Sequence, residues 1–157
     1  MPQVNQLYEA SQVFIQRLED GANIIERPSH YIAGGIEARH VIQSWCLGWE
    51  LGTAVKYILR AGRKDDEIAD LLKCREYLKF AVASPNDLDV RPGRLVPRHS
   101  VPDGYQPKAV AEAFGLSERR ANALAAICRV WPHKEDAEAA LAEINAEIEY
   151  LETQEIA

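Results

Sequence analysis

The sequence lacks the patterns that mark disulfide-rich, zinc-binding and membrane-spanning proteins. It has three cysteines, Cys46, Cys74 and Cys128, an odd number with no C-x-x-C pair, which argues against a disulfide framework or a zinc site. No stretch approaches about eighteen uninterrupted apolar residues, and the N-terminus has no basic region followed by an apolar run. We therefore expect a cytoplasmic protein without a membrane anchor, whose cysteines are reduced packing residues.

Several signatures of nucleotide binding and catalysis are also absent. The chain has no G-x-x-x-x-G-K-[ST] segment, which excludes a kinase of the P-loop class, and no G-x-G-x-x-G, H-E-x-x-H or G-x-S-x-G segment. The formal net charge of -6 does not suit a protein that wraps nucleic acid, because that affinity comes from many Lys and Arg side chains displacing counterions. Any phosphoryl transfer must use another scaffold, and nucleic acid is a disfavoured partner.

The composition is that of a globular protein built largely from helices. Apolar residues make up 47% of the chain and charged residues 27%, so the chain can bury a core. Apolar positions recur at helical spacing on both sides of a Pro-rich stretch, which predicts an all-α fold, a compact helical bundle. The predicted parts are an N-terminal helix in residues 1–25, a first unit in 26–83, a Pro-rich connection in 84–107 and a C-terminal helical unit in 108–157.

Within the first unit, glycines predict where helices begin and end. Residues 26–37 read ERPSHYIAGGIE, and their proline and glycine pair predict an irregular loop. Gly48 and Gly52 weaken the helical pattern that follows and predict two helices that meet between them. Gly62 is expected to end the second of these helices.

The two halves of the chain resemble each other at an offset of 69 residues, which places Val41 on Val110 and Ile58 on Ile127. We interpret this as a degenerate internal repeat, in which two helical hairpin units pack as a pseudo-symmetric pair. The alternative is a chance match between two amphipathic helical segments.

Cations gather in the segment KYILRAGRK. Lys56 and Arg60 are four residues apart and share a helix face, and Arg63 and Lys64 continue the stripe into the turn. Phosphate matches such a cluster best, because Arg binds it bidentately and Lys binds it as a point charge. The alternative is a solvated basic face that pairs with the acidic residues 65–67.

The loop before these helices supplies further groups. His30 offers a proton carrier and Tyr31 a hydroxyl or stacking group, and the Gly34 and Gly35 pair lets backbone amides approach an anion. For His30 alone, a structural hydrogen-bonding role is the alternative.

Asp70, Lys73 and Tyr77 are expected on one face of the next helix, where an ordinary exposed ion pair is the alternative. Glu67 and Asp70 also have the E-x-x-D spacing with which helical pyrophosphohydrolases hold magnesium. A full site would need a second pair, for which Glu143 with Glu147 is the nearby candidate.

A different function is suggested by AVAEAFGLSERRANALAAI, which resembles a helix-turn-helix. Ser117 would cap the second helix, and Arg119, Arg120 and Asn122 would contact DNA. The acidic charge of the chain disfavours this interpretation, and the same segment is also the second half of the repeat.

One ordered set of residues between Arg27 and Leu78 resembles a known family, the SaV-like bacteriophage proteins, a domain of unknown function. The family includes a phage nucleotide kinase that lacks a P-loop, phosphorylates deoxynucleoside monophosphates and forms a large homo-oligomer. The elements that carry the resemblance are Pro28, His30 and Tyr31; Gly35 to Glu37; Lys56 and Tyr57; Arg60 to Gly62; Lys64; Asp70 and Leu71; Lys73; and Tyr77 and Leu78.

The resemblance implies a phage origin, the cytoplasm of an infected bacterium, nucleotide binding, homo-oligomers, and phosphoryl transfer from a nucleoside triphosphate with Mg2+ as cofactor. Loss of nucleotide binding in Arg60→Ala with the fold retained is the expected test. From the residue patterns and the resemblance together, the expected catalytic residues are His30, Asp70 and Lys73, with Asp70 as the candidate metal ligand, and the expected nucleotide-binding residues are Tyr31, Gly34, Gly35, Lys56, Tyr57, Arg60, Arg63 and Lys64.

The chain departs from the family pattern at two positions. Thr53 follows Gly52 where the family usually has Asn, and His40 stands where an acidic residue is frequent. If either lost group orients substrate or metal, the protein binds nucleotide without turnover. A non-catalytic effector that binds a host protein is therefore the main alternative.

Overall fold

The computed structural model describes residue 25 and residues 27–83, 101–128 and 134–157. Residues 1–24 of the predicted N-terminal helix, most of the Pro-rich connection and the break expected at Trp131 and Pro132 lie outside the described residues. The described part is mostly helical, with six α-helices and one small two-stranded sheet. The prediction of a compact, mostly helical fold is confirmed.

The first half begins with a short hairpin in place of the predicted irregular loop. After the 3-10 helix η1 (Ser29–Tyr31), strands β1 (Ile32–Ala33) and β2 (Ile36–Glu37) pair antiparallel. Gly34 and Gly35 form the turn, with φ angles of 53° and 77°. A two-residue turn with positive φ at both positions matches the twist of paired strands, and glycine adopts it without strain. The loop prediction was wrong here because the strands are too short to show a periodic pattern.

Three helices follow the hairpin: α2 (Ala38–Ser44), α3 (Trp49–Arg60) and α4 (Glu67–Ala83). The helix junction lies slightly before the predicted interval, since Gly48 is the N-cap of α3 and Gly52 lies within that helix. A Cβ atom on Gly52 would lie 3.0 Å from Cγ2 of Ile42, so glycine permits the close approach of α2 and α3. Gly62 follows the end of α3 with a φ of 79°, as predicted.

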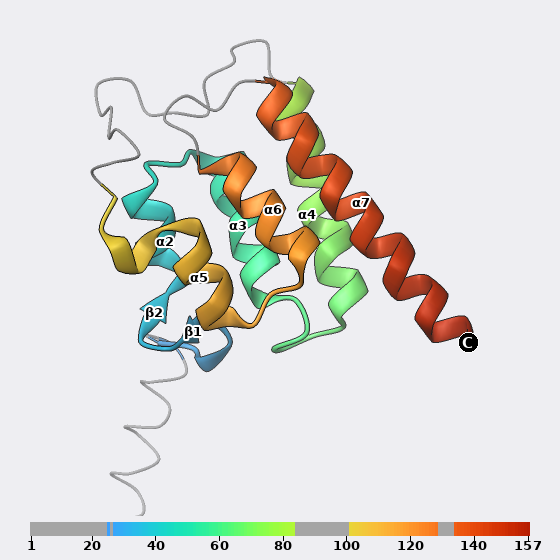
Figure 1. The fold of residues 1–157 in the computed structure, drawn as a ribbon, viewed down its shortest axis with the longest axis horizontal. Helices are drawn as coiled ribbons and strands as arrows, with labels where there is room; N and C mark the ends of the chain where they lie inside the picture. The colour runs from blue at the N-terminus through green and yellow to red at the C-terminus, as the bar shows by residue number, and fades with distance from the viewer. Residues whose placement is uncertain (1–24, 26, 84–100, 129–133) are drawn as a thin grey trace, which may run out of the picture.

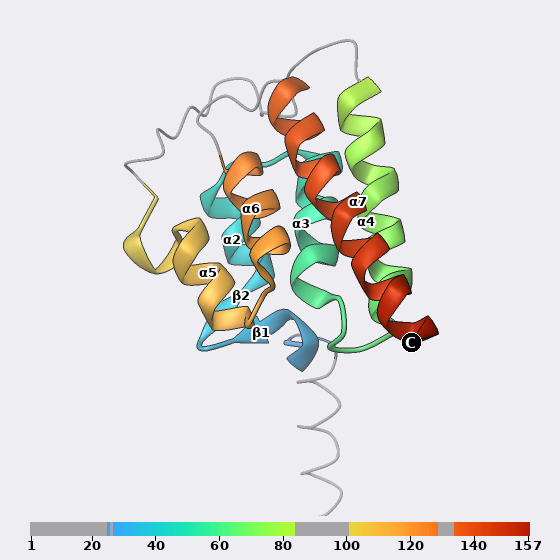
Figure 2. The ribbon, with the colours of Figure 1, turned by 45° about the vertical axis from the view of Figure 1, so that its right-hand side comes forward.

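The second half contains the 3-10 helix η3 (Asp103–Tyr105) and helices α5 (Pro107–Phe114), α6 (Glu118–Ile127) and α7 (Lys134–Ile156). Helix α7 packs along α4, and α6 packs against both α7 and α3 (Figures 1 and 2). None of the helices in the described ranges is long and apolar enough to cross a membrane. The fully buried core side chains include Val41, Ile58, Leu59, Leu71, Leu78, Val110, Leu124, Ile127 and Ile144.

The offset of 69 residues also relates the helices in space. The order α2, α3, α4 is followed by α5, α6, α7, and each helix starts within a few residues of its counterpart in that register. Cys46 and Gly115, which the offset pairs, both have positive φ, 54° and 63°. The next residue in each half donates its N–H to the carbonyl five residues earlier, Leu47 to Ile42 and Leu116 to Ala111. The two halves therefore share the same helix–turn–helix backbone.

Candidate functional site

Three cations lie around the ring of Tyr57 on α3. Nζ of Lys56 is 4.6 Å from the ring centroid, Cζ of Arg60 is 4.9 Å away, and Nζ of Lys73 is 5.6 Å away. Tyr77 of α4 stacks on Tyr57 with a centroid distance of 6.2 Å and an interplanar angle of 29°. We name these five residues the Tyr57 cluster. Lys56 and Arg60 are four residues apart on α3, and Lys73 and Tyr77 are four residues apart on α4. The cluster forms because these two helices pack together.

Arg60 is buried and bound to a buried carboxylate. Its Nε donates to Oδ2 of Asp70 at 3.0 Å and its NH2 to Oδ1 at 2.6 Å, while its NH1 donates to the Tyr31 hydroxyl at 3.2 Å. The side chain of Asp70 is fully buried, and Asp65 adds a second, partly exposed carboxylate 3.3 Å from the guanidinium. The bidentate pair fixes Arg60 between the hairpin and α4.

The pKa of Asp70 reflects two opposing causes. Burial alone raises it, but the hydrogen bonds and charge of Arg60, with a smaller effect of Lys73, bring it below the ordinary value of 3.8. The hydrogen bond from Arg60 to Asp70 in turn raises the pKa of the guanidinium. Both groups therefore stay charged at neutral pH.

His30 stands at the edge of this arrangement. Its ring centroid is 4.2 Å from that of Tyr31. Burial, followed by the positive charges of Lys64 and Arg60, lowers the pKa of His30 below its ordinary value of 6.5. The imidazole is therefore neutral at pH 7, with one nitrogen free to accept a proton. The charge of Lys64, an exposed residue after α3, acts on this edge of the site.

Three predicted residues make their contacts elsewhere. NH2 of Arg63 donates to the carbonyl of Ile32 at 2.9 Å, and its guanidinium lies 5.2 Å from the ring centroid of Phe114 on α5. Gly34 lies against Ala113 of α5, and Gly35 has open space where a side chain would stand. Arg63, Gly34 and Gly35 thus lie at the hairpin and α5, away from the Tyr57 cluster, which lies between α3 and α4.

The carboxylates predicted to hold magnesium are divided between two arginines. Both oxygens of Asp70 accept hydrogen bonds from Arg60, and Oε1 of Glu67 accepts one from NH1 of Arg120 at 3.1 Å. Within the described residues no group of three or more His, Cys, Asp or Glu side chains is placed to hold a metal ion. The assignment of Asp70 as a metal ligand does not fit this geometry, because its oxygens are already used to position Arg60.

A groove follows α2 and α3 beside the Tyr57 cluster. It consists of a hollow of about 380 Å³ lined by Trp49, Gly52, Thr53 and Lys56, and of a smaller one of about 170 Å³ near Tyr31 that shares Ile42 and Lys56 with the first. We name the two hollows the α2–α3 groove. Lys56 therefore contributes to both the groove and the Tyr57 cluster.

Trp49 is a candidate residue that the sequence pattern missed. It falls at an apolar position of the helical repeat, yet it is 71% exposed. Its ring meets that of Tyr77 edge-on at 6.4 Å and 72°. Its place at the first position of α3, next to the N-cap glycine, is the signal that would have indicated exposure.

The residues predicted to contact DNA are engaged inside the molecule. The backbone does form a helix-turn-helix, and Ser117 caps α6 by accepting from the N–H of Arg120 at 3.3 Å. Arg120, however, is buried. Arg119 pairs with Glu147 at 3.3 Å, and the side-chain amide of Asn122 donates to Glu143 at 3.4 Å. Arg120 is thus held inside the fold, and the more exposed Arg119 and Asn122 are bound to carboxylates of α7.

Comparison with known proteins identifies one domain. Residues 25–79 match the family model DUF3310, described as a protein of unknown function, and this domain contains the hairpin, α2, α3 and most of α4. All members of the Tyr57 cluster lie within it. No curated protein and no solved structure matches the chain.

Proposed function

We propose that this protein binds phosphorylated nucleotides, with the phosphate at the Tyr57 cluster. The observation that carries the proposal is the convergence of Lys56, Arg60 and Lys73 on one tyrosine ring in a chain whose formal net charge is -6. Asp70 pairs with both Arg60 and Lys73, and Asp65 approaches Arg60, so that three cations face two carboxylates. The excess positive charge favours an anion, and phosphate is the biological anion that ammonium and guanidinium groups bind best.

The structure changes the role that we assign to Arg60. Its guanidinium is largely buried and bound to Asp70, so its main effect is to hold Tyr31 and Tyr57 in place. Lys73, with 48% of its side chain exposed, and the half-buried Lys56 are the cations that a ligand can reach. Arg60→Ala is therefore a poor test of binding, because it would remove the bidentate partner of the buried Asp70 and leave it the 3.4 Å contact with Lys73.

As an enzyme, the protein would transfer a phosphoryl group from a nucleoside triphosphate to a deoxynucleoside monophosphate. Little covalent participation by the protein is needed in such a reaction, because positioning and neutralisation of phosphate charge supply most of the catalysis. Lys56 and Lys73 would neutralise the phosphates, and Mg2+ would arrive bound to the triphosphate. The resemblance of residues 27–78 to the SaV-like phage proteins supports this activity, a phage origin, action in the cytoplasm of an infected bacterium, and a homo-oligomer.

The test is a calorimetric titration with deoxynucleoside monophosphates and nucleoside triphosphates, with and without Mg2+. Lys56→Ala and Lys73→Ala should each weaken binding about tenfold or more, because a hydrogen bond to a charged group contributes about 1.5–3 kcal/mol. Lys79→Ala is the matched control, since Lys79 lies on the same helix as Lys73, is 49% exposed and pairs with Glu76 outside the cluster. Equal affinities in all three variants would rule out the proposed site.

Product analysis of the same mixtures separates a kinase from a binding protein. Formation of a deoxynucleoside diphosphate that requires Lys73 would establish the transferase. Binding without product would establish a nucleotide-binding protein without turnover, as the departures at Thr53 and His40 allow.

A host-protein effector is the second candidate. It is favoured by the exposure of two large apolar side chains beside the cluster, Trp49 at 71% and Phe80 at 57%, since exposed aromatic patches often mark protein interfaces. If no nucleotide binds, and Phe80→Ser abolishes capture of one defined host protein while Lys79→Ala does not, this function replaces the first.

A further inference from the structure

The α2–α3 groove offers different chemistry along its length. Trp49, Thr53 and Lys56 are at i, i+4 and i+7 on α3 and line one hollow of this groove. Seven helical residues span about 10 Å, a length comparable with that of a single nucleotide. An aromatic ring therefore lies at one end of the hollow and an ammonium group at the other.

Trp49 is exposed and lies beside other aromatic rings. Its ring lies edge-on to that of Tyr77 of α4 at 6.4 Å, while 71% of the residue remains accessible to solvent. Phe80, which is 57% exposed, also meets Tyr77 edge-on, so Trp49 belongs to an exposed aromatic patch, and such patches mark ligand or partner sites. Stacking on aromatic rings is a common way in which proteins bind nucleobases, because every base has a π face.

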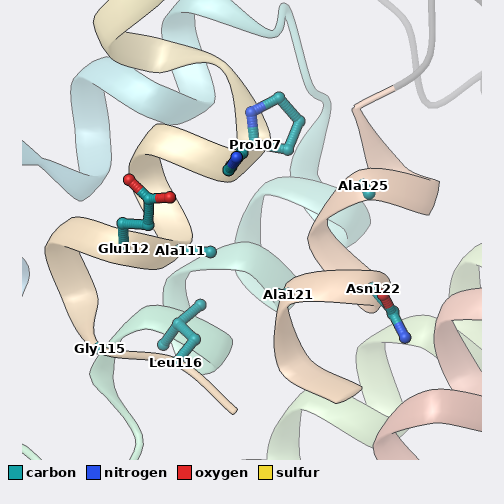
Figure 3. A pocket seen from close by; sticks show the side chains of 9 residues that line it. Pro107, Ala111, Glu112, Gly115, Leu116, Ala121, Asn122 and Ala125 are labelled. Carbon is teal, nitrogen blue, oxygen red and sulfur yellow. The ribbon is translucent and has the colours of Figure 1, made fainter. Parts of the chain in front are cut away.

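The second half of the molecule contains an equivalent groove that serves as an internal comparison. It has a volume of about 420 Å³ and lies between α5 and α6 (Figure 3). Nine residues line it, and the 69-residue offset places seven of them on residues that line the α2–α3 groove, for example Ala121 on Gly52 and Asn122 on Thr53. The hollow itself is thus a consequence of how each helix pair packs.

The two grooves differ at the positions that bear the ligand chemistry. The offset replaces Trp49 by Glu118 and Lys56 by Ala125. Figure 3 shows Ala125 on α6, where Lys56 stands on α3 in the first half. An aromatic ring and a cation at these two positions of the second helix are therefore not requirements of the shared packing; the lysine that lines the second groove, Lys108, lies on α5 and is the counterpart of Arg39.

We propose that Trp49 is the nucleobase-binding residue of this protein: the base stacks on its ring, the sugar lies over Gly52 and Thr53, and the phosphate is bound by Lys56. This assignment rests on the proposed nucleotide binding and adds to it the residue that recognises the base. It also assigns the face on which the nucleotide lies, the side of α3 that faces α2.

The experiment compares two ligands that differ only in the base. Calorimetry is used to measure binding of the tightest of the four deoxynucleoside monophosphates and of deoxyribose 5-phosphate, which keeps the sugar and the phosphate. Trp49→Ala should weaken binding of the nucleotide at least about fivefold and leave the affinity for deoxyribose 5-phosphate unchanged. Trp49→Phe, which keeps a ring, should recover most of the loss.

Two control variants separate stacking from general effects. Phe80→Ala removes an exposed aromatic residue that contacts Tyr77 but does not line the groove, and Glu118→Ala changes the position equivalent to Trp49 in the second half. Neither should alter the affinity for either ligand. Binding of both ligands to the wild type with no selective loss in Trp49→Ala would overturn the base site and leave phosphate binding intact. Failure of the wild type to bind either ligand would overturn both proposals.

Discussion

The two halves of this protein each contain a buried arginine, Arg60 and Arg120, and the two arginines bind different kinds of partner. Arg60 forms a bidentate pair with Asp70, ten residues away, and all three of its nitrogens donate hydrogen bonds. Arg120 reaches across from α6 and donates to the carbonyls of Ile58 and Ala61 at the end of α3, and to the carboxylate of Glu67. Its Nε has no hydrogen-bond partner within the described part of the chain.

The difference shows what each guanidinium does for the site. The charge of Arg60 is matched by a fully buried carboxylate, so the pair is self-contained within the DUF3310 domain. Arg120 instead satisfies carbonyl groups that the end of a helix leaves without partners, where a cation is also favoured by the helix dipole. It ties the second half of the chain to the segment that carries Arg60 and Lys64.

The largest expected effect comes from breaking the self-contained pair. Arg60→Met should lower the free energy of unfolding by about 3–5 kcal/mol, because it removes the bidentate partner of the buried Asp70 carboxylate and leaves it the 3.4 Å contact with the half-exposed Lys73. Urea unfolding followed by circular dichroism measures the change. The double variant Arg60→Met with Asp70→Leu should recover most of the loss, since it removes both charges. A loss of less than about 1 kcal/mol in the single variant would mean that the pair is hydrated like a surface salt bridge.

The same two arginines show what the sequence could and could not predict about the site. Helical spacing grouped Arg60 with Lys56 and Lys73 with Asp70, and the resemblance to a known family assigned both groups to one site. The burial of Arg60 and Asp70 depends on packing between helices, which spacing does not reveal, so the sequence did not show that the oxygens of Asp70 bind Arg60. Arg120 lies more than fifty residues from its partners, and the local pattern around it pointed to DNA.

The helices were predictable for a similar reason. Apolar positions at helical spacing indicated α3, α4 and α6 because each of these helices packs against neighbouring helices. The hairpin of β1 and β2 was missed because two-residue strands carry no period, although the glycine pair between them was a usable turn signal. The exposure of Trp49 was not predictable, because helical spacing gives the face of a residue and not how far the neighbouring helix covers it.

Arg120 should contribute less to stability than Arg60. Arg120→Met leaves two carbonyl acceptors and one partly exposed carboxylate without a partner, which should lower the free energy of unfolding by about 1–3 kcal/mol. Lys79→Met is the control, because Lys79 is 49% exposed and its partner Glu76 is 51% exposed, so that both charges stay in water; its loss should be within about 1 kcal/mol. If Arg120→Met lowered the free energy of unfolding more than Arg60→Met, the hydrogen bonds of Arg120 to the carbonyls would stabilise the fold more than the Arg60–Asp70 pair.

The smallest expected effect is a difference in acid sensitivity between these variants. In the wild type the pKa of Asp70 lies below its ordinary value of 3.8 because Arg60 outweighs burial. Its contribution to stability is therefore complete above pH 3.8 and is lost as the pH falls through the lower, folded-state pKa. Arg120→Met leaves this pair intact and should show the same acid dependence as the wild type.

Arg60→Met should reverse the sign of this contribution. Without the guanidinium, Lys73 still lowers the pKa of Asp70, but burial is the largest of the causes, so we expect the pKa to rise above 3.8. The folded variant then binds more protons than the unfolded chain, so its deficit relative to the wild type should shrink as the pH falls towards 3.8, at about 1.4 kcal/mol for each unit of pKa change. The urea midpoints of the wild type, Arg60→Met and Arg120→Met between pH 7 and pH 3 measure this change in stability. The other carboxyl groups are the same in all three proteins, so their titration does not affect the comparison. A deficit that stays constant with pH would show that Asp70 is ionised in the variant and that water, not Arg60, can stabilise its charge.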